Sequence, residues 1–583
     1  MIPILPRPVA AASAVFLIAV SLLFSWPPAS AQQSPSIGDG GRDLSPGRTR
    51  PELPPLGDVP KPGFELPPVL PESERGRAPS GVQVEISGID FEGNTVFTDD
   101  ELAAIAAPYV GRAINTSELL ELRDSLTRHY IENGHVNSGA VIPDQAIDRG
   151  RIVVRIVEGR LSEIVTGGLT RLDTGFVESR VRYGLDPVLD VDQLRENIGL
   201  LLLDPSIARL DAKLNPGERP GESRLALDVE EAPPYRMDFV IANNRAPSVG
   251  AERGEASFTY VDVSGRSDLL SFGFGLSAGT RDVNFDYDTP LTAGDLRAFI
   301  ATSYGETEVV EEPFNAIDIE SETFNIETGL SLPLIRSVQR ELRLDTSFDY
   351  KRSRTSIVGT PTSLSLGARN GRSSISALRF KQNYRIRERQ QALVLKSTMS
   401  LGLNVLNATQ NRSGIPDGQY FAWLGQAQYA RRLFSSDWQA TLRADVQLTP
   451  DPLLAIERIG IGGADTVRGY RQNELVFDNG WVASAGLQIP VGRVTLPGLA
   501  RTLDDGRITL RPFIDAGGGW NTDAPDGDVT ELLSVGLGLG WNLFGQTDLK
   551  LDFGLPILDT DSPENEDLQD YGIHFRLSTA LDG

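Results

Sequence analysis

The sequence predicts a soluble α+β region followed by an all-β transmembrane barrel of about sixteen antiparallel strands. Three observations lead to this prediction. Between Val82 and Glu231, strand patterns are mixed with amphipathic helix patterns. After Tyr235, short segments alternate apolar and polar residues, as strands with one lipid face and one wet face do. Past the N-terminal region no apolar run approaches the roughly 18 residues of a membrane helix, so strands must do any spanning.

The first 31 residues have the pattern of an export signal. Arg7 precedes an apolar run from Val9 to Phe24, and Ala29-Ser30-Ala31 supplies a small-residue cleavage site. The alternative is a retained membrane anchor, but the run is shorter than the ~20 residues that a spanning helix needs. We therefore expect residues 1–31 to be a signal peptide and the mature chain to begin at Gln32.

Residues 32–80 are rich in proline and glycine, as in Pro51-Glu52-Leu53-Pro54-Pro55. Proline lacks a backbone donor and fixes φ, so a long helix is excluded here. The composition favours a flexible linker over a proline-motif ligand for another protein.

Composition excludes several classes of function. The formal net charge of −24, with no strongly basic run, argues against nucleic acid as a partner. The chain has no cysteine, and His129, His135 and His574 are too scattered for a ligand set, so no metal site is expected. No Gly-x-Ser-x-Gly elbow stands in a strand-to-helix setting and no phosphate-binding glycine loop is present, so we expect no enzyme activity, no catalytic residue and no cofactor.

A first soluble domain is predicted for residues 81–160. Thr98 followed by Glu101 is a capping box that opens a helix. The next helix carries one apolar stripe and ends at Gly134. The predicted elements are a strand over 82–91, the helix after Thr98, a helix over 116–132, and strands over 136–143 and 151–158.

Residues 161–232 repeat this order in weaker form. The order strand, helix, helix, strand, strand recurs, which predicts a second small domain of the same kind. Its predicted elements are a strand over 161–165, helices over 174–183 and 190–203, and strands over 208–214 and 224–230.

Residues 233–583 are predicted to form the barrel. From Tyr235 onward roughly 350 residues remain, about 22 for each of sixteen strands with its connection, which suits a tilted strand of ~10 residues. An even count puts both ends of the barrel on the same side as the soluble region. The clearest predicted strands are 342–350, 378–386, 393–405, 438–448, 533–543 and 549–555.

One of the longest connections, residues 451–479, joins the eleventh and twelfth predicted strands and holds Arg468 in a glycine-rich stretch. Long loops without regular structure of their own are usually functional or disordered. In the thirteenth predicted strand, the alternation of Ile508, Leu510 and Ile514 leaves Asp515 facing the lumen. Either Arg468 pairs with this carboxylate, or Asp515 only polarises the lumen and Arg468 is solvated.

Three groups of residues carry a resemblance to a known family. The first domain is similar to the polypeptide-transport-associated (POTRA) domain of TpsB-type two-partner secretion transporters, the ShlB/FhaC/HecB family. The shared residues are Gly93-Asn94-Thr95-Val96-Phe97, Tyr130, Gly134, Pro143, Gln145 and Glu158-Gly159. The second domain resembles the end of that family's second POTRA domain in residues 215–221 and 228–231. With the glycine-rich loop, the resemblance spans residues 82–583.

The resemblance implies an outer-membrane translocase of Gram-negative bacteria with its POTRA domains in the periplasm. Such a protein takes up an unfolded, TpsA-like exoprotein through these domains and secretes it through the barrel without nucleotide hydrolysis. The implied partners are this exoprotein and outer-membrane lipid, and we expect the protein to work as a monomer.

In that family, the arginine of a Val-Arg-Gly-Tyr loop turns back into the lumen and pairs with an aspartate in an Asp-x-Gly context. The resemblance thus implies a loop latch made of Val467, Arg468, Gly469 and Tyr470 with Asp515. One departure concerns the N-terminal helix that plugs the barrel in many members, because the prolines of residues 34–79 leave no amphipathic stretch for it.

Two other classes of function stay open. An assembly factor that inserts other barrels has the same general plan, but its relatives usually carry more soluble modules. A passive porin is the third class, and it needs neither tandem soluble domains nor a latched loop.

Overall fold

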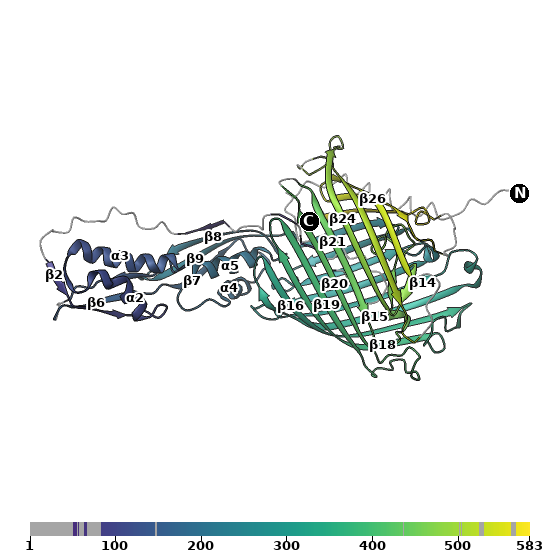
Figure 1. Ribbon diagram of the computed structural model, residues 1–583, viewed down its shortest axis with the longest axis horizontal. Coiled ribbons are helices and arrows are strands. Elements are labelled where there is room, and N and C mark those ends of the chain that lie inside the picture. The colour runs from purple at the N-terminus through teal and green to yellow at the C-terminus, as the bar shows by residue number, and fades with distance from the viewer. Residues whose placement is uncertain are drawn as a thin grey trace. The chain divides into compact units, whose positions relative to one another are not determined.

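The computed structural model describes residues 51–54, 56–57, 63–66, 83–145, 149–434, 437–500, 502, 504–523, 530–560 and 567–583. The signal peptide expected at residues 1–31 lies outside this part of the chain. The described residues form two compact units, both visible in Figure 1. One is a soluble unit within residues 60–232, and the other combines the barrel with residues 51–57.

The first half of the soluble unit mixes short strands with two α-helices. Its elements are β2 (Gln83–Ile86), β3 (Gly88–Glu92), α2 (Asp99–Ala106), the 3₁₀ turn η2 (Ala107–Tyr109), β4 (Arg112–Asn115), α3 (Thr116–Glu132), β5 (Gly139–Val141) and β6 (Arg151–Val157). The predicted capping box is confirmed, since Thr98 and Glu101 exchange hydrogen bonds at the start of α2. β6 pairs in parallel with β3 and antiparallel with β5. Leu122, Leu126 and Tyr130 of α3 are fully buried in the core of this half.

The second half has its own hydrophobic core. Its elements are β7 (Arg160–Gly167), α4 (Thr174–Arg182), α5 (Val191–Leu202), β8 (Ile207–Pro216) and β9 (Glu222–Glu231). The sheet order is β1-β8-β9-β7, where β1 (Gly63–Glu65) comes from the proline-rich segment. Both helices pack their buried side chains, such as Val177 and Leu194, against this sheet. None of the described helices is long and apolar enough to cross a membrane.

Besides β1, which lies in the predicted linker, the soluble unit differs from the sequence prediction in three places. The single strand expected over 82–91 is broken at Ser87 into β2 and β3, which pair with different partners. The strand expected over 136–143 shortens to β5. Strand β4 was not predicted, because it is a four-residue segment between two helices with no alternating pattern.

A repeated carboxylate clamp closes each half of the soluble unit. Glu158 accepts hydrogen bonds from the backbone N of Thr95 at 2.6 Å and of Val96 at 2.9 Å, and the Thr95 hydroxyl donates to the same carboxylate. Glu231 likewise accepts from the backbone N and the hydroxyl of Thr170, at 2.8 and 2.6 Å. The same set of hydrogen bonds, between a Gly-x-Thr loop and a glutamate about 60 residues later, therefore occurs in both halves.

The clamp lowers the pKa of both carboxyl groups. Burial alone would raise the pKa of Glu158, but hydrogen bonds from Thr95 and Val96 outweigh it and hold the pKa below its usual value. At Glu231 burial is likewise outweighed, by Thr170 and the backbone of Arg171, and the pKa falls to about 2. Because the folded state favours the ionised carboxyl, the clamp stabilises at neutral pH.

Replacing Glu231 with glutamine is expected to lower the free energy of unfolding of the second half of the soluble unit by about 2 kcal/mol at pH 7. In the wild type, the stabilisation is present above the ordinary carboxyl pKa of 4.5 and is lost as the pH falls toward 2. Amide exchange of Thr170 and Leu172 in the full chain measures this, with an acceleration of roughly 30-fold expected. The exposed neighbour Glu230→Gln is the control, and equal exchange in both variants would contradict the clamp.

The barrel is closed and antiparallel, and the predicted count of sixteen strands is confirmed, with the two-residue β17 (Thr360–Pro361) as a short addition to β16. The strands are β10 (Tyr235–Ala242), β11 (Arg253–Val261), β12 (Leu269–Leu276), β13 (Thr280–Pro290), β14 (Arg297–Glu308), β15 (Ile319–Arg336), β16 (Arg340–Ile357), β18 (Arg372–Arg387), β19 (Gln391–Gly402), β20 (Phe421–Arg432), β21 (Gln439–Leu448), β24 (Asn479–Arg493), β25 (Arg507–Trp520), β26 (Glu531–Phe544), β27 (Thr547–Pro556) and β28 (Ile573–Asp582). β10 pairs with β28 to close the wall. Two 3₁₀ turns, η3 (Pro247–Val249) and η4 (Phe314–Ile317), lie in connections.

The two faces of the wall differ as the alternation predicts. Leu551, Phe553 and Leu555 of β27 are exposed on the outside, while Asp552 between them points inward. In β25, Ile514 is exposed and Asp515 is buried on the lumen side. Among the six clearest predicted strands, the strand over 393–405 is longer than β19, which ends at Gly402.

Candidate functional site

The connection between β21 and β24 packs against the inner wall of the barrel. It contains the 3₁₀ turn η5 (Ala455–Glu457) and a hairpin of β22 (Ile459–Ile461) with β23 (Leu475–Phe477). The expectation that this loop lacks regular structure is therefore wrong for the hairpin. Apolar side chains of the hairpin share one buried cluster with Val482 of β24 and Leu532 of β26, so the loop has a fixed seat on the wall.

Arg468 at the tip of this loop contacts Asp515 of β25 through three donors. Its Nε lies 2.7 Å from Oδ2 and its Nη2 lies 2.9 Å from Oδ1, while its backbone N lies 3.1 Å from Oδ2. Ser484 of β24 adds a hydroxyl donor 2.5 Å from Oδ1. Asp515 is 0% exposed, so this carboxylate is fully desolvated and is satisfied by the loop and by Ser484.

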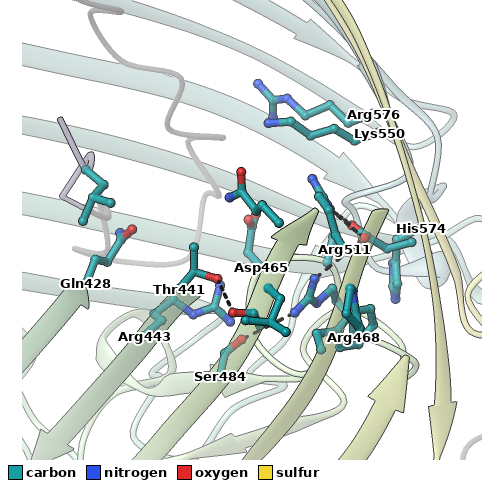
Figure 2. Close-up of a pocket in the computed structure, with 18 of the residues that line it drawn as sticks. Gln428, Thr441, Arg443, Asp465, Arg468, Ser484, Arg511, Lys550, His574 and Arg576 are labelled. Carbon is teal, nitrogen blue, oxygen red and sulfur yellow. Dashed lines mark hydrogen bonds and ion pairs between the residues drawn. The ribbon is translucent and has the colours of Figure 1, made fainter. Parts of the chain in front are cut away.

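A second ion pair lies beside the first. Arg511 of β25 donates through Nη2 to both carboxylate oxygens of Asp552, at 2.6 and 2.7 Å. Nη1 of Arg468 lies 3.7 Å from the same carboxylate, and the ring centroid of Phe513 lies 3.4 Å from the Arg468 guanidinium carbon. Figure 2 shows Arg468 and Arg511 converging on this part of the lumen. Two arginines and two carboxylates thus balance in charge, and Phe513 supports the guanidinium of Arg468.

Val467 and Gly469, on either side of Arg468, both lie against the barrel wall. Val467 is fully buried in the apolar cluster under the hairpin. Gly469 has φ +96°, and its backbone N lies 3.2 Å from Nε2 of His574. A Cβ on Gly469 would lie 2.9 Å from the backbone of Gly554 in β27, and a Cβ on Gly554 would lie 2.6 Å from the N of Gly469. The loop and the wall therefore approach backbone to backbone.

Tyr470 attaches the next turn of the loop to two other segments. Its hydroxyl oxygen lies 2.7 Å from the carbonyl oxygen of Leu533 in β26 and 2.9 Å from that of Leu558 after β27. The backbone N of each leucine lies within 3.3 Å of the same hydroxyl. All four loop residues singled out from the sequence therefore contact the wall, and Asp515 meets Arg468 directly.

Arg471 provides a further contact that sequence reasoning missed. Its Nη1 lies 2.9 Å from Oε1 of Glu311 and its Nη2 lies 2.8 Å from Oδ2 of Asp570, both in connections between strands. The Arg471 side chain is 10% exposed. The neighbouring Val-Arg-Gly-Tyr motif gave no reason to single this arginine out, because its partners are distant in sequence and lie in irregular segments.

The loop is also held near its start. Glu457 of η5 is buried, with Lys351 Nζ at 3.1 Å and Arg379 Nη2 at 2.8 Å from its Oε1. Arg379 also donates from Nε to Asp349 at 2.9 Å. This contact ties the loop to β16 and β18, on a part of the wall well separated in strand order from β25.

A cavity of about 440 Å³ lies between the loop and the lumen wall. Arg443, Asp465, Lys550 and Arg576 are among its lining residues, and Figure 2 shows these side chains around one open space. Leu53 of the proline-rich segment also lines it, and Gln428 of β20 donates a hydrogen bond of 2.5 Å to the carbonyl of Pro51. The described residues of this segment in the lumen, 51–54 and 56–57, form neither helix nor strand.

Comparison with known proteins identifies the family. The sequence profile of the haemolysin secretion/activation protein ShlB/FhaC/HecB matches residues 221–543, and that of the ShlB-type POTRA domain matches residues 84–159. The chain belongs to this family. It is therefore an outer-membrane transporter with a POTRA-containing periplasmic region, and the translocase implied by the resemblance is the function that the family has.

Individual relatives in this family are distant in sequence. The outer membrane transporter CdiB of Escherichia coli is 23% identical over 430 residues, which cover 71% of this chain and 70% of CdiB. The heme/hemopexin transporter protein HuxB of Haemophilus influenzae (strain 86-028NP) is 24% identical over 321 residues, 54% of this chain and 56% of HuxB. The solved structure of CdiB from Escherichia coli has a TM-score of 0.65 at 19% identity, covering 88% of this chain and 93% of that one, and shows the shared fold.

Proposed function

We propose that this transporter exports one dedicated, unfolded exoprotein through the barrel lumen, without nucleotide hydrolysis, as a monomer. The observation that carries the proposal is the loop held inside the lumen by the Arg468–Asp515 pair. A connection that is fastened to the inner wall by an ion pair can be released when the lumen has to admit a polypeptide. A route that must be closed at rest and opened for a polypeptide needs such a connection.

The residues of the loop latch, Val467 to Tyr470 with Asp515, are proposed to hold the lumen in its resting arrangement. The arginine contributes a charge-assisted bidentate contact, which is directional and can be exchanged for other partners. A polypeptide entering the lumen brings backbone donors and acceptors that replace such contacts one at a time. Export then draws on the folding of the exoprotein outside the cell, which disfavours its return.

The direct test compares cells with and without this chain by mass spectrometry of the culture medium and the outer-membrane fraction. Loss of one or two large exoproteins from the medium, with other barrels unchanged, is the expected result. A general fall in outer-membrane barrels would instead favour an assembly factor. No change in either fraction would contradict a dedicated transporter.

Deleting residues 83–231 separates a transporter from a passive porin. We expect the truncated barrel to reach the outer membrane and to lose export of the exoprotein by at least about tenfold, because recognition in the periplasm is removed. The amount of barrel is measured in parallel by heat-modifiable mobility in gels. Export that persists at the wild-type level would argue against a role of the soluble unit in recognition.

A further inference from the structure

The proline-rich segment adds a strand to the sheet in the second half of the soluble unit. β1 lies parallel to β8, and the paired residues are Gly63 with Asp211, Phe64 with Ala212, and Glu65 with Lys213. Within the part of the chain that the structure describes, β8 has β9 on one side and only β1 on the other. The edge of this sheet is thus occupied by the first described element of the soluble unit, which comes before both of its halves in the chain.

Specific side-chain contacts accompany the pairing. The ring of Phe64 packs against the core of the second half, opposite Ala212, whose small side chain leaves room for it. The guanidinium carbon of Arg195 in α5 lies 5.5 Å from the ring centroid of Phe64. On the outward face, Lys213 Nζ lies 3.3 Å from Oε2 of Glu65. The edge therefore has an inward site for an aromatic ring and an outward site for a carboxylate.

The pairing is short for reasons that the sequence makes plain. β1 has three residues, whereas β8 has ten. Pro60 and Pro62 precede β1 and Pro67 follows it closely, and a proline cannot donate to a strand ladder. Among the described residues, β1 pairs with only three of the ten residues of β8, which leaves the rest of that edge open to a longer strand. A three-residue strand also makes few hydrogen bonds that must be broken.

We propose that the β8 edge is a docking site for an extended segment of the exoprotein, and that β1 is a built-in competitor displaced when that segment binds. The proposal rests on the proposed export of an unfolded exoprotein. An incoming strand would place an aromatic or large aliphatic side chain where Phe64 lies, and an acidic side chain opposite Lys213. It would exceed three residues, and the additional ladder hydrogen bonds would favour it over β1.

A reversible disulfide tests the displacement. The natural chain has no cysteine, so Glu65→Cys with Lys213→Cys introduces a single possible bond between two exposed, paired positions. Oxidation holds β1 on β8, and reduction frees it. The probe is the exoprotein that disappears from the medium of cells lacking this chain, labelled and diluted from urea onto the purified full chain in detergent.

The expected result is at least about tenfold weaker binding of this probe to the oxidised form than to the reduced form. The matched control is Glu163→Cys with Arg224→Cys, a parallel pair between β7 and β9 with a similar exposed ion pair. Oxidation of the control should leave binding unchanged, since it crosses the same sheet without covering its β8 edge. Equal binding to the oxidised and reduced forms of the first pair would overturn the proposal.

A second variant tests the competition from the other side. Phe64→Ser removes the ring that seats β1, and we expect the probe to bind about threefold more tightly because the edge is free more often. Unchanged or weaker binding would contradict a competitor role for β1. The outcomes also separate the two proposals. If wild-type cells export an exoprotein but its binding is the same in both variants as in the wild type, only the docking site is contradicted. If no exported protein is found at all, both proposals are contradicted.

Discussion

Replacing Arg468 with alanine is expected to lower export of the exoprotein at least tenfold while the barrel still reaches the outer membrane. Asp515 is fully buried, and its carboxylate would lose the two guanidinium donors of Arg468 and keep only the backbone N of residue 468 and the hydroxyl of Ser484. Removing one partner of a buried ion pair typically costs about 3–5 kcal/mol, because the remaining charge is left uncompensated. That is enough to unseat the loop. Immunoblots of the medium, normalised to folded barrel, measure the effect.

The pairing itself is tested by exchanging the charges. Arg468→Asp and Asp515→Arg should each abolish export, and the double variant should recover part of it. Additive loss in the double variant would show that the two residues do not act as a pair. Arg354→Ala is the control, because Arg354 also lies in the barrel and faces a carboxylate, that of Glu322, but both side chains are about half exposed.

Replacing Gly469 with valine is expected to have an effect of similar size without removing any charge. The residue has φ +96°, which a β-branched side chain rarely adopts, and its Cβ would collide with the backbone of Gly554. Gly554→Val should produce the same loss from the other side of the contact. Export and barrel abundance are measured as for Arg468→Ala.

The control for this substitution is Gly414→Val in another connection. Gly414 has a similar φ of +81°, but nothing lies within 4 Å of the position of its Cβ. Gly414→Val therefore introduces backbone strain without a collision, whereas Gly469→Val introduces both, and the difference between them reports the close approach of loop and wall. If Gly469→Val and Gly414→Val export equally well, the seat of the loop against β27 is not needed for export.

The sequence predicted the barrel more completely than the soluble region. Strands between lipid and a wet lumen must alternate along their whole length, so parity alone placed Asp515 inward and Ile514 outward. In the soluble unit, β4 and β5 are too short to show a period, and the break at Ser87 leaves the apolar pattern continuous. The fold of β1 was not predictable either, since prolines around it indicate a linker.

The candidate site was foreseen only where a motif marks it. The resemblance named Arg468 and Asp515, which the structure brings into contact, and their role in export stays a prediction. Glu457 and Arg471 were not singled out, because their partners lie on β16, β18 and irregular connections whose registers no local pattern specifies. Contacts between a long loop and distant strands depend on the closed barrel, so they follow from tertiary structure alone.

The most direct test of export through the lumen is site-specific crosslinking to an exoprotein stalled during secretion. A photoreactive residue at position 550 replaces Lys550, which lines the lumen cavity, and one at position 551 replaces Leu551, which is exposed on the outer face of the same strand. We expect a crosslinked adduct with the stalled exoprotein from position 550 and none from position 551. Adducts from position 551 alone, or from neither position while export continues, would contradict passage through the barrel.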